Sequence, residues 1–366
     1  MGCCCKAAIF EEVGKPIEVR DFEVPEAIEE NAMLVKVTFA TICGSDLHTI
    51  TGKRKEAAPL ILGHEIIGTI AKLGSPNLKD GYGNTLKIGD RISWTVMASC
   101  GECFYCQKGI PQKCVNLKKY GHTCAYDPEI KSGLVGGYGE YVYILPGTTV
   151  FKLSDKLSDE VATPANCALA TVVNAVETIG VEKGDAVLIQ GAGLLGLNAC
   201  ALSAAAGAKA IIITDVVDSR LEDAKRFGAT HTINLKEVAD VADLVKKIKE
   251  IAPYGVDAAL EFCGRAEACT QAIAALRIGG RYMIAGMVAP TPLDLDANNI
   301  TRKCLTIKGI HNYTPEHLGK ALKFLEEFGD KFPYAELVGE VFTLDKINEA
   351  VEVSKSQKYV RVAIKY

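Results

Sequence analysis

The stretch Ala186-Val187-Leu188-Ile189-Gln190-Gly191-Ala192-Gly193-Leu194-Leu195-Gly196 decides the fold of the second half of the chain. An apolar run of strand length leads directly into the pattern G-x-G-x-x-G, and an alanine-rich segment follows. Such a glycine pattern alone also occurs in ordinary tight turns. A strand, a glycine turn and a helix in this order predict a dinucleotide site, because backbone N–H groups at a helix N-terminus can hold a pyrophosphate. The predicted cofactor-binding residues in the turn are Gly191, Gly193, Leu194, Leu195 and Gly196.

An acidic residue ends the next predicted strand, Ala210 to Asp215, 19 positions after Gly196. The Asp215 carboxylate is placed to accept hydrogen bonds from the adenosine ribose, as in dinucleotide-binding folds. Because a carboxylate repels a 2′-phosphate, the pattern predicts NAD rather than NADP. Arg220 could soften this preference by binding the phosphate, or it could be an exposed helix arginine. The sequence leaves both alternatives open.

The order of predicted elements indicates two domains. Strands are predicted at 186–190, 210–215, 232–234 and 256–261, with a helix at 219–227 among the connections. Alternation of strand and helix is typical of a parallel sheet covered on both faces. The first 150 residues instead hold short β-like runs, such as 33–39, 91–96 and 140–144, separated by turn residues. We therefore expect a mostly antiparallel β domain first and an α/β domain second.

Bulk composition narrows the classes of function. The 366 residues are long enough for about two domains, and the net charge of −4 without a basic run argues against a nucleic-acid partner. The longest nearly apolar stretch, 194–208, is shorter than the roughly 20 residues of a membrane span. The residues Met1 to Lys6 lack the apolar core of a signal peptide, so we expect a cytoplasmic protein whose cysteines, 14 in all, are not a disulfide framework.

Four cysteines form a local cluster with the spacing C-x2-C-x2-C-x7-C: Cys100, Cys103, Cys106 and Cys114. Short loops of this kind can wrap one metal ion and present four thiolates, as structural zinc sites do. Iron–sulfur clusters also use tight cysteine runs, but the bacterial run ends with a three-residue gap and a proline. Here the last gap has seven residues and Val115 follows. The spacing favours structural zinc.

A second set of metal-ligating residue types is spread along the chain. Cys43, the triplet Gly63-His64-Glu65 and Cys167 would each be unremarkable alone, since a single buried cysteine or histidine is usually a core residue. Together they offer two thiolates and an imidazole. Three protein ligands with a fourth position open are typical of catalytic zinc.

With these motifs in place, the chain resembles the zinc-dependent medium-chain alcohol dehydrogenases. The strings at 43–48, 63–65, 100–114, 137–142 and 191–196 occur in the family's order. The resemblance implies a GroES-like catalytic domain at 1–167 and 311–366, with a zinc lobe near 95–120, and a Rossmann domain at 168–310. It also implies hydride transfer between a small alcohol and NAD, with two zinc ions per chain.

The resemblance assigns roles to individual residues. Cys43, His64 and Cys167 would bind the catalytic zinc, Glu65 would lie beside it as a transient ligand, and Asp46 would orient the His64 ring. Ser45 and His48 would relay the hydroxyl proton to solvent by way of the nicotinamide ribose. Arg361 matches a position that contacts the cofactor pyrophosphate, with a surface arginine on an edge strand as the alternative.

Several short sequence strings resemble those of the family branch that is associated with phosphonate catabolism. The strings at 43–49, 93–96, 117–122 and 164–171 carry this likeness. Cations near the predicted zinc site could hold a phosphonate head, and Arg54 is the strongest candidate because a guanidinium matches a tetrahedral oxyanion. A polyol or secondary-alcohol dehydrogenase, and a non-catalytic NAD-binding relative, remain alternatives. We expect a homodimer or homotetramer with no membrane partner.

Overall fold

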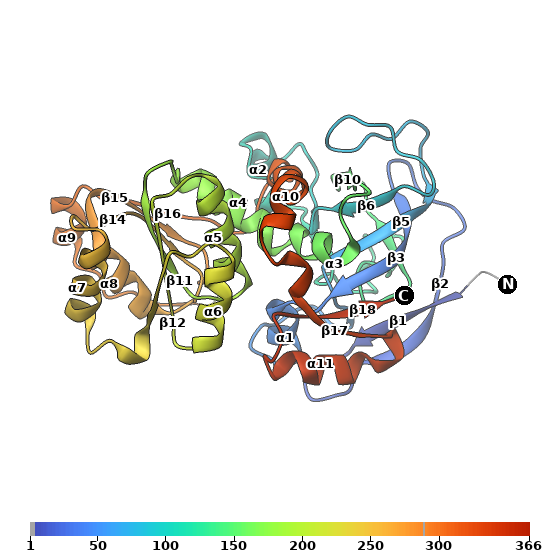
Figure 1. Ribbon diagram of the computed structural model, residues 1–366. Helices are drawn as coiled ribbons and strands as arrows, with labels where there is room; N and C mark the ends of the chain where they lie inside the picture. The colour runs from blue at the N-terminus through green and yellow to red at the C-terminus, as the bar shows by residue number, and fades with distance from the viewer. Residues whose placement is uncertain (1–3, 288–289) are drawn as a thin grey trace. The chain divides into compact units, whose positions relative to one another are not determined.

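The structure is a computed structural model that describes residues 4–287 and 290–366, so Gly2 and Cys3 of the thiol-rich start lie outside it (Figure 1). The chain divides into two compact units. The first comprises Met1–Cys167, Thr314–Gly329 and Tyr334–Tyr366, and the second comprises Ala168–Tyr313 with Asp330–Pro333. The chain returns to the first unit at Thr314, where a capping box of Thr314 and His317 begins the next helix.

The first unit is built on antiparallel strands. Its strands are β1 Cys4–Phe10, β2 Glu18–Glu23, β3 Met33–Thr41, β4 Leu60–Ile61, β5 Glu65–Leu73, β6 Arg91–Trp94, β7 Met97–Ala98, β8 Lys118–Lys119, β9 Tyr141–Ile144, β10 Val150–Lys152, β17 Val338–Phe342 and β18 Arg361–Lys365. The main sheet has the order β10-β6-β5-β3-β18-β17, with β9 also paired to β3. Only the β17–β18 pair in this sheet is parallel among the described residues. The sequence-distant β18 therefore lies beside β3.

Short helices and turns complete the first unit. Its α-helices are α1 Gly44–Ile50, α2 Phe104–Gln107, α3 Asp159–Ala162, α10 Pro315–Phe328 and α11 Ile347–Lys355, with short 3-10 turns between them. The predicted strand at 91–96 ends at Trp94, since the Thr95 hydroxyl donates to the Met97 carbonyl and closes a turn. Large side chains such as Trp94 and Tyr143 fill the core between the strands.

The second unit is a parallel sheet between two layers of helices. Its strands are β11 Ala186–Gln190, β12 Ala210–Asp215, β13 His231–Asn234, β14 Val256–Glu261, β15 Leu276–Ile284 and β16 Thr306–Gly309. The sheet order is β13-β12-β11-β14-β15-β16, and all its pairs are parallel. This is the Rossmann order, in which the strand sequence reverses beside β11. The α/β prediction for this half is confirmed.

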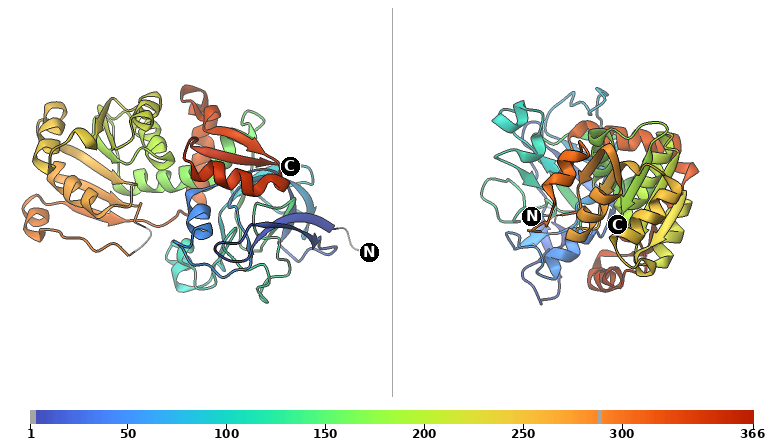
Figure 2. Two further views of the ribbon diagram at one scale, coloured as in Figure 1. Left: turned by 90° about the horizontal axis from the view of Figure 1, so that it is seen from below. Right: turned by 90° about the vertical axis from the view of Figure 1, so that its left-hand side faces the viewer.

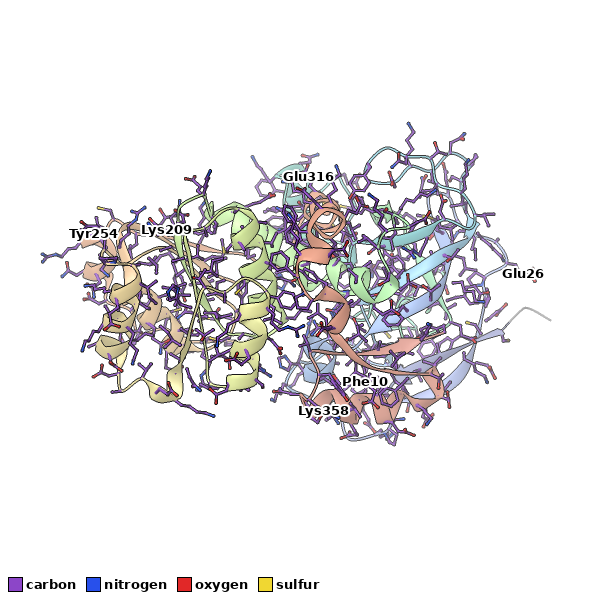
Figure 3. The ribbon with its side chains drawn as sticks, in the orientation of Figure 1. Phe10, Glu26, Lys209, Tyr254, Glu316 and Lys358 are labelled. Carbon is purple, nitrogen blue, oxygen red and sulfur yellow. The ribbon has the colours of Figure 1, made fainter. Side chains whose placement is uncertain are left out.

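Helices cover both faces of that sheet. They are α4 Ala168–Ile179, α5 Leu194–Ala205, α6 Asp218–Arg226, α7 Val241–Ile251, α8 Ala266–Ala275 and α9 Ala297–Arg302. Helices α5 and α6 lie on one face, and α7 and α8 lie on the other (Figures 1 and 2). All five residues of β11 are buried, whereas side chains at the rim such as Tyr254 project to solvent (Figure 3). Over the described residues, no helix has the length and apolar character that crossing a membrane requires.

Candidate zinc centres and dinucleotide turn

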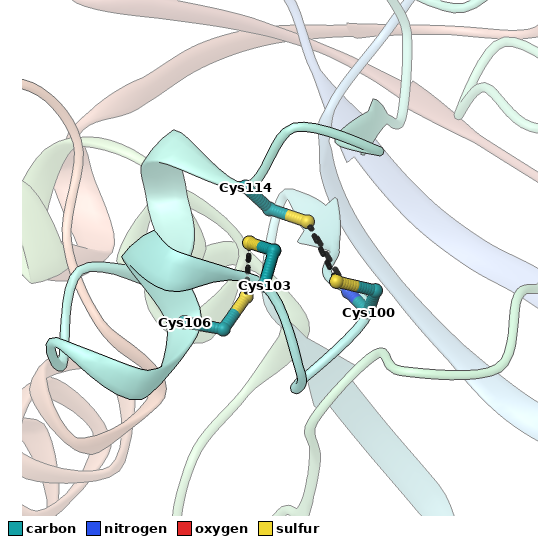
Figure 4. A group of neighbouring side chains, drawn as sticks. All are labelled: Cys100, Cys103, Cys106 and Cys114. Carbon is teal, nitrogen blue, oxygen red and sulfur yellow. Dashed lines mark hydrogen bonds between the residues drawn. The ribbon is translucent and has the colours of Figure 1, made fainter.

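The four-cysteine lobe brings its thiols together without a disulfide (Figure 4). Cys103 precedes α2, Cys106 lies within it, and Cys114 follows the 3-10 turn Pro111–Lys113. The Sγ atoms of Cys103 and Cys106 are 3.5 Å apart, those of Cys100 and Cys114 are 3.4 Å apart, and all four lie within 4.8 Å of one another. Four zinc–sulfur bonds of about 2.3 Å at tetrahedral angles need sulfur atoms about 3.8 Å apart. The cluster therefore fits one zinc ion.

Backbone N–H groups donate hydrogen bonds to the thiols of Cys103 and Cys114. Hydrogen bonds from the N–H groups of Cys106 and Val115 lower the pKa of Cys103 to about 6. The Cys114 Sγ accepts from the N–H of Cys100 at 3.3 Å and from that of Asn116 at 3.4 Å. Because the thiolate is the form that binds zinc, these contacts favour metal binding.

The second cluster gathers Cys43, His64, Glu65 and Cys167, whose ligand atoms lie within 4.8 Å of one another. Cys43 follows β3 and His64 precedes β5, and these strands are neighbours with Thr41 opposite Glu65. Cys167 ends the 3-10 turn Thr163–Asn166, which packs on β5. The fold thus brings together ligand types that are more than a hundred positions apart.

Asn166 fastens that turn beside the cluster. Its amide nitrogen donates to the His64 carbonyl at 3.1 Å and to the Trp94 carbonyl at 3.2 Å, and the side chain is fully buried. No sequence motif predicted a role for Asn166. Its one available signal was its position next to Cys167.

The electrostatics of the second cluster suit a metal cation. The pKa of Cys43 lies well below its usual value because the Cys167 side chain hydrogen-bonds to it and because Arg361 and His64 are close. Burial lowers the pKa of His64, but the negative charges of Asp46 and Cys43 outweigh burial and raise it. The negative charges that favour a protonated His64 would equally stabilise a metal cation in place of that proton. Thiol and imidazole groups are the donors that zinc prefers, so these residues fit a second zinc ion.

Asp46 holds the His64 ring in one orientation. The His64 Nδ1 lies 3.1 Å from Asp46 Oδ1, which leaves Nε2 as the ring atom available to a metal. Asp46 is fully buried, and it also accepts from the Cys43 N–H at 2.9 Å. One carboxylate thereby touches both Cys43 and His64.

Glu65 and Arg361 are joined by two charge-assisted hydrogen bonds. The Arg361 Nε lies 2.7 Å from Glu65 Oε2 and Nη2 lies 2.8 Å from Oε1, while Nη2 is 3.7 Å from the Cys43 Sγ. The Thr41 hydroxyl also donates to Glu65 Oε2 at 2.6 Å. Glu65 therefore lies next to the candidate metal ligands, whereas the partner of Arg361 was not predicted. The contact of Arg361 with a pyrophosphate stays a prediction.

The predicted relay residues lie on α1. The Ser45 Oγ is 3.3 Å from the His64 Nε2, the ring atom that Asp46 leaves available, whereas His48 is exposed. A hydroxyl next to the metal site and an imidazole at the surface, one helical turn apart, match the two ends of a proton path.

Arg54 lies in a chain of polar contacts that reaches the candidate metal ligands. Its Nε is 2.5 Å from Glu56 Oε1, and that oxygen is 3.2 Å from the His122 Nδ1. The His122 ring lies against His64 with 5.0 Å between ring centroids. Lys119 belongs to the same neighbourhood, since burial, Arg54 and Lys113 lower its pKa to about 8. Lys118, by contrast, is paired with Asp127 and Glu129.

The glycine turn of the second unit has the features that its motif predicts. Gly191 has φ +99°, a conformation that favours glycine, and a Cβ at Gly196 would lie 1.9 Å from the Gly191 carbonyl oxygen. A Cβ at Gly193 would meet no atom within 4 Å, so the space in front of α5 is open. The turn lies at the end of β11, where the strand order reverses and where such folds bind ligands. These residues fit a dinucleotide.

Asp215 ends β12 beside this turn. Its Oδ2 accepts from the Ala192 N–H at 2.7 Å, and its Oδ1 accepts from the Val216 and Val217 N–H groups at 2.7 and 3.0 Å. Arg220 lies on α6, which begins three residues after Asp215. Asp215 therefore contacts the glycine turn directly, and Arg220 follows it five positions later in the chain.

Comparison with known proteins identifies the class. The model of the alcohol dehydrogenase GroES-like domain matches residues 29–155, and the model of the zinc-binding dehydrogenase matches residues 195–327. The sorbitol dehydrogenase of Bacillus subtilis is 32% identical over 352 residues, covering 95% of this chain and 92% of the relative.

Solved structures agree. An alcohol dehydrogenase from Thermotoga maritima has a TM-score of 0.92 and 30% identity, and a zinc-binding dehydrogenase from Sinorhizobium meliloti, bound to NADP, has a TM-score of 0.86 and 26% identity. Both alignments cover 100% of each chain.

The fold and the two thiol clusters define a zinc-binding oxidoreductase with a dinucleotide domain. The chain belongs to the zinc-binding medium-chain alcohol dehydrogenase family, whose members act on CH–OH groups with zinc and a nicotinamide cofactor. The expectation of a non-catalytic relative loses support, because all the predicted ligand types lie together.

Proposed function

We propose that the chain oxidises a small alcohol to its aldehyde or ketone with NAD, or catalyses the reverse, at a catalytic zinc held by Cys43, His64 and Cys167. The observation that carries this proposal is the convergence of two half-buried thiols and one buried imidazole, with the buried carboxylate of Glu65 beside them. The four-cysteine lobe would hold the structural zinc. A closed set of four thiolates has no position for a substrate, so the chemistry belongs to the second cluster.

When bound, zinc would supply a Lewis acid that favours loss of the proton from a hydroxyl group. The chain would do the rest with its own groups. Asp46 would keep Nε2 of His64 directed to the metal, and Arg361 would hold Glu65 as a nearby carboxylate for ligand exchange. The Ser45 Oγ would accept the substrate proton, and His48 would pass it to solvent.

The cofactor proposed for the second unit is NAD. The open space before Gly193 supports an approach of the pyrophosphate, and Asp215 would receive the ribose hydroxyls. Since the Sinorhizobium relative is bound to NADP, the preference needs its own test. Asp215→Asn should raise the ratio of kcat/KM for NADP over NAD, because it removes the charge that repels the 2′-phosphate. An unchanged ratio would remove Asp215 from this role.

The reaction is tested with purified protein, NAD and a panel of polyols, simple alcohols and hydroxyalkylphosphonates. We expect NADH formation with at least one class, complete loss of turnover in Cys43→Ser, and loss of turnover on chelation while NADH binding persists. Cys124→Ser, a change of a free cysteine outside both clusters, is the matched control. Full turnover by zinc-free protein would contradict the proposal.

A finer proposal concerns the substrate: a hydroxyalkylphosphonate. The support is that the cations Arg54, Lys113 and Lys119 lie close together near Glu56. Glu56 contacts His122, whose ring lies against His64. Arg54 is neutralised in part by Glu56, so Lys119 joins Arg54 as an anion-binding candidate. Arg54→Ala should reduce kcat/KM for the phosphonate and leave a neutral alcohol unaffected. Equal losses on both would count against anion recognition.

A polyol or secondary alcohol is the competing substrate class. Its support is the similarity to sorbitol dehydrogenase across nearly the whole chain. The same panel separates the two classes: a preference for vicinal diols over phosphonates, unaffected by Arg54→Ala, would establish the polyol activity.

Location and assembly complete the proposal. The thiol clusters need a reducing compartment to stay reduced, which supports a cytoplasmic protein. Phe104 and Val115 of the four-cysteine lobe are each 66% exposed, and apolar side chains exposed in this way support a contact between copies in a homodimer or homotetramer. Light scattering on the purified protein distinguishes these states, and a monomer would contradict them.

A further inference from the structure

Asp46 is fully buried and has four hydrogen-bond donors around it. Three of them belong to the segments that carry the metal ligands: the Cys43 N–H at 2.9 Å, the Gly63 N–H at 3.4 Å and the His64 Nδ1 at 3.1 Å. The fourth comes from elsewhere in the chain. It is the hydroxyl of Tyr138, 92 positions away, which donates to Asp46 Oδ2 at 3.1 Å.

Tyr138 is held rigidly in place. It is fully buried, its N–H bonds to the Leu62 carbonyl at 3.0 Å, and its carbonyl accepts from the Ala8 N–H at 2.7 Å. The ring lies so close to Gly63 that a Cβ there would be 2.7 Å from two ring carbons, and Gly63 has φ +86°. The residue before His64 must therefore be glycine, because the tyrosine ring occupies the side-chain space.

We infer that Tyr138 is a positioning residue that fixes Asp46, and through it the Cys43 backbone and the His64 ring, in the geometry that binds the catalytic zinc. The hydroxyl supplies a neutral donor to a carboxylate that has no access to water. Without this donor, a buried carboxylate would recruit its remaining donors differently, and two of those donors belong to the metal-binding residues. This inference rests on the proposed zinc site at Cys43, His64 and Cys167.

Tyr138 should affect only one of the two candidate zinc sites. The four-cysteine lobe has its own hydrogen bonds from the N–H groups of Cys106, Val115 and Asn116. The four donors described for Asp46 come instead from Cys43, Gly63, His64 and Tyr138. Burial raises the pKa of the Tyr138 hydroxyl, and Asp46 raises it further, so it stays protonated as a donor. Its removal should loosen one zinc ion and leave the other unchanged.

The test is Tyr138→Phe in the full-length, zinc-loaded protein, which keeps the ring that packs on Gly63. Zinc release to a chromophoric chelator should show one ion per chain bound about tenfold more weakly, the low end for groups that orient metal ligands, and one ion unchanged. In cobalt-substituted protein the absorption of the affected site should shift, and the pH profile of kcat should move. Tyr143→Phe is the matched control, since Tyr143 is equally buried and its hydroxyl hydrogen-bonds to Glu29 instead of Asp46.

A double variant tests whether Tyr138 affects the zinc site through Asp46. If Tyr138 acts through Asp46, Tyr138→Phe should weaken zinc binding little or not at all in an Asp46→Asn background. Equal loss of zinc in Tyr138→Phe and Tyr143→Phe, or wild-type zinc affinity and an unmoved pH profile in Tyr138→Phe, would overturn the inference. Failure of the underlying site assignment is recognised separately, because Cys43→Ser would then retain two zinc ions.

Discussion

Arg361 and Glu65, 296 positions apart, form a two-pronged ion pair in the interior of the first unit, with donor–acceptor distances of 2.7 and 2.8 Å. Glu65 is fully buried and Arg361 is 8% exposed. Burying either charge alone would cost free energy, so each residue offsets the cost of burying the other. Arg361 also places its positive charge next to the Cys43 thiol, which lowers the pKa of that thiol.

The ion pair predicts strong coupling in a double-mutant cycle. Arg361→Met should lower the free energy of unfolding by about 3–5 kcal/mol, because it leaves a buried carboxylate unpaired. Glu65→Gln combined with Arg361→Met should cost less than the sum of the single changes. Urea denaturation of the zinc-loaded protein measures the free energy of unfolding of each variant. Arg20→Met, which removes an exposed arginine paired with Glu11 and Glu18, should change little, and additive losses at Glu65 and Arg361 would contradict the coupling.

The pairing of Arg361 with Glu65 could not be predicted from the sequence, whereas the parallel sheet could. The alternation of strands and helices after position 186 predicted the parallel sheet, because each element carries its own hydrophobic period. The partner of Arg361 depends instead on β18 pairing with β3, an event of tertiary structure with no local signal. The same holds for Tyr138: the string Gly137-Tyr138-Gly139 could be seen, but its contact with Asp46 follows from chain packing.

The predicted metal ligands show an intermediate degree of predictability. Residue type and family likeness were enough to select Cys43, His64 and Cys167, and the structure places their ligand atoms together. Asn166, which ties Cys167's turn to the His64 carbonyl, was not selected because an asparagine carries no ligand chemistry. Residues that support a site are harder to predict than residues that perform its chemistry, since their role depends on which backbone group lies opposite.

The four-cysteine lobe predicts separable losses of zinc. Cys103→Ser should reduce the zinc content from two ions to one per chain and lower thermal stability, because a structural zinc site contributes to folding. Elemental analysis of the purified protein measures the content, and kcat of the remaining folded protein should be close to wild type. Cys124→Ser is the control that should keep both ions. Two zinc ions in Cys103→Ser would show that this thiol is not a ligand.

The glycine turn predicts two different effects from the same added methyl group. Gly196→Ala should destabilise the second unit, since its Cβ would lie 1.9 Å from the Gly191 carbonyl oxygen. Gly193→Ala should leave the melting temperature nearly unchanged, because its Cβ meets no atom within 4 Å. It should nevertheless weaken NADH binding, as the methyl group would occupy the space proposed for the pyrophosphate. Fluorescence titration with NADH and thermal denaturation separate the effects, and wild-type NADH affinity in Gly193→Ala would place the cofactor elsewhere.

The low pKa of Lys119 predicts how recognition of an anionic substrate changes with pH. Burial is the main cause of the shift to about 8, and Arg54 and Lys113 add to it. Lys119 is therefore charged below this pH and neutral above it. Between pH 7 and 9 the protonated fraction falls by about tenfold, and kcat/KM for an anionic alcohol should fall in proportion relative to that for a neutral alcohol. A hydroxyalkylsulfonate is the better probe than a phosphonate, because its charge is constant over this range. Lys119→Met should lower the ratio at pH 7 and abolish its dependence on pH. A ratio that stays constant in the wild-type protein would exclude Lys119 from the substrate site.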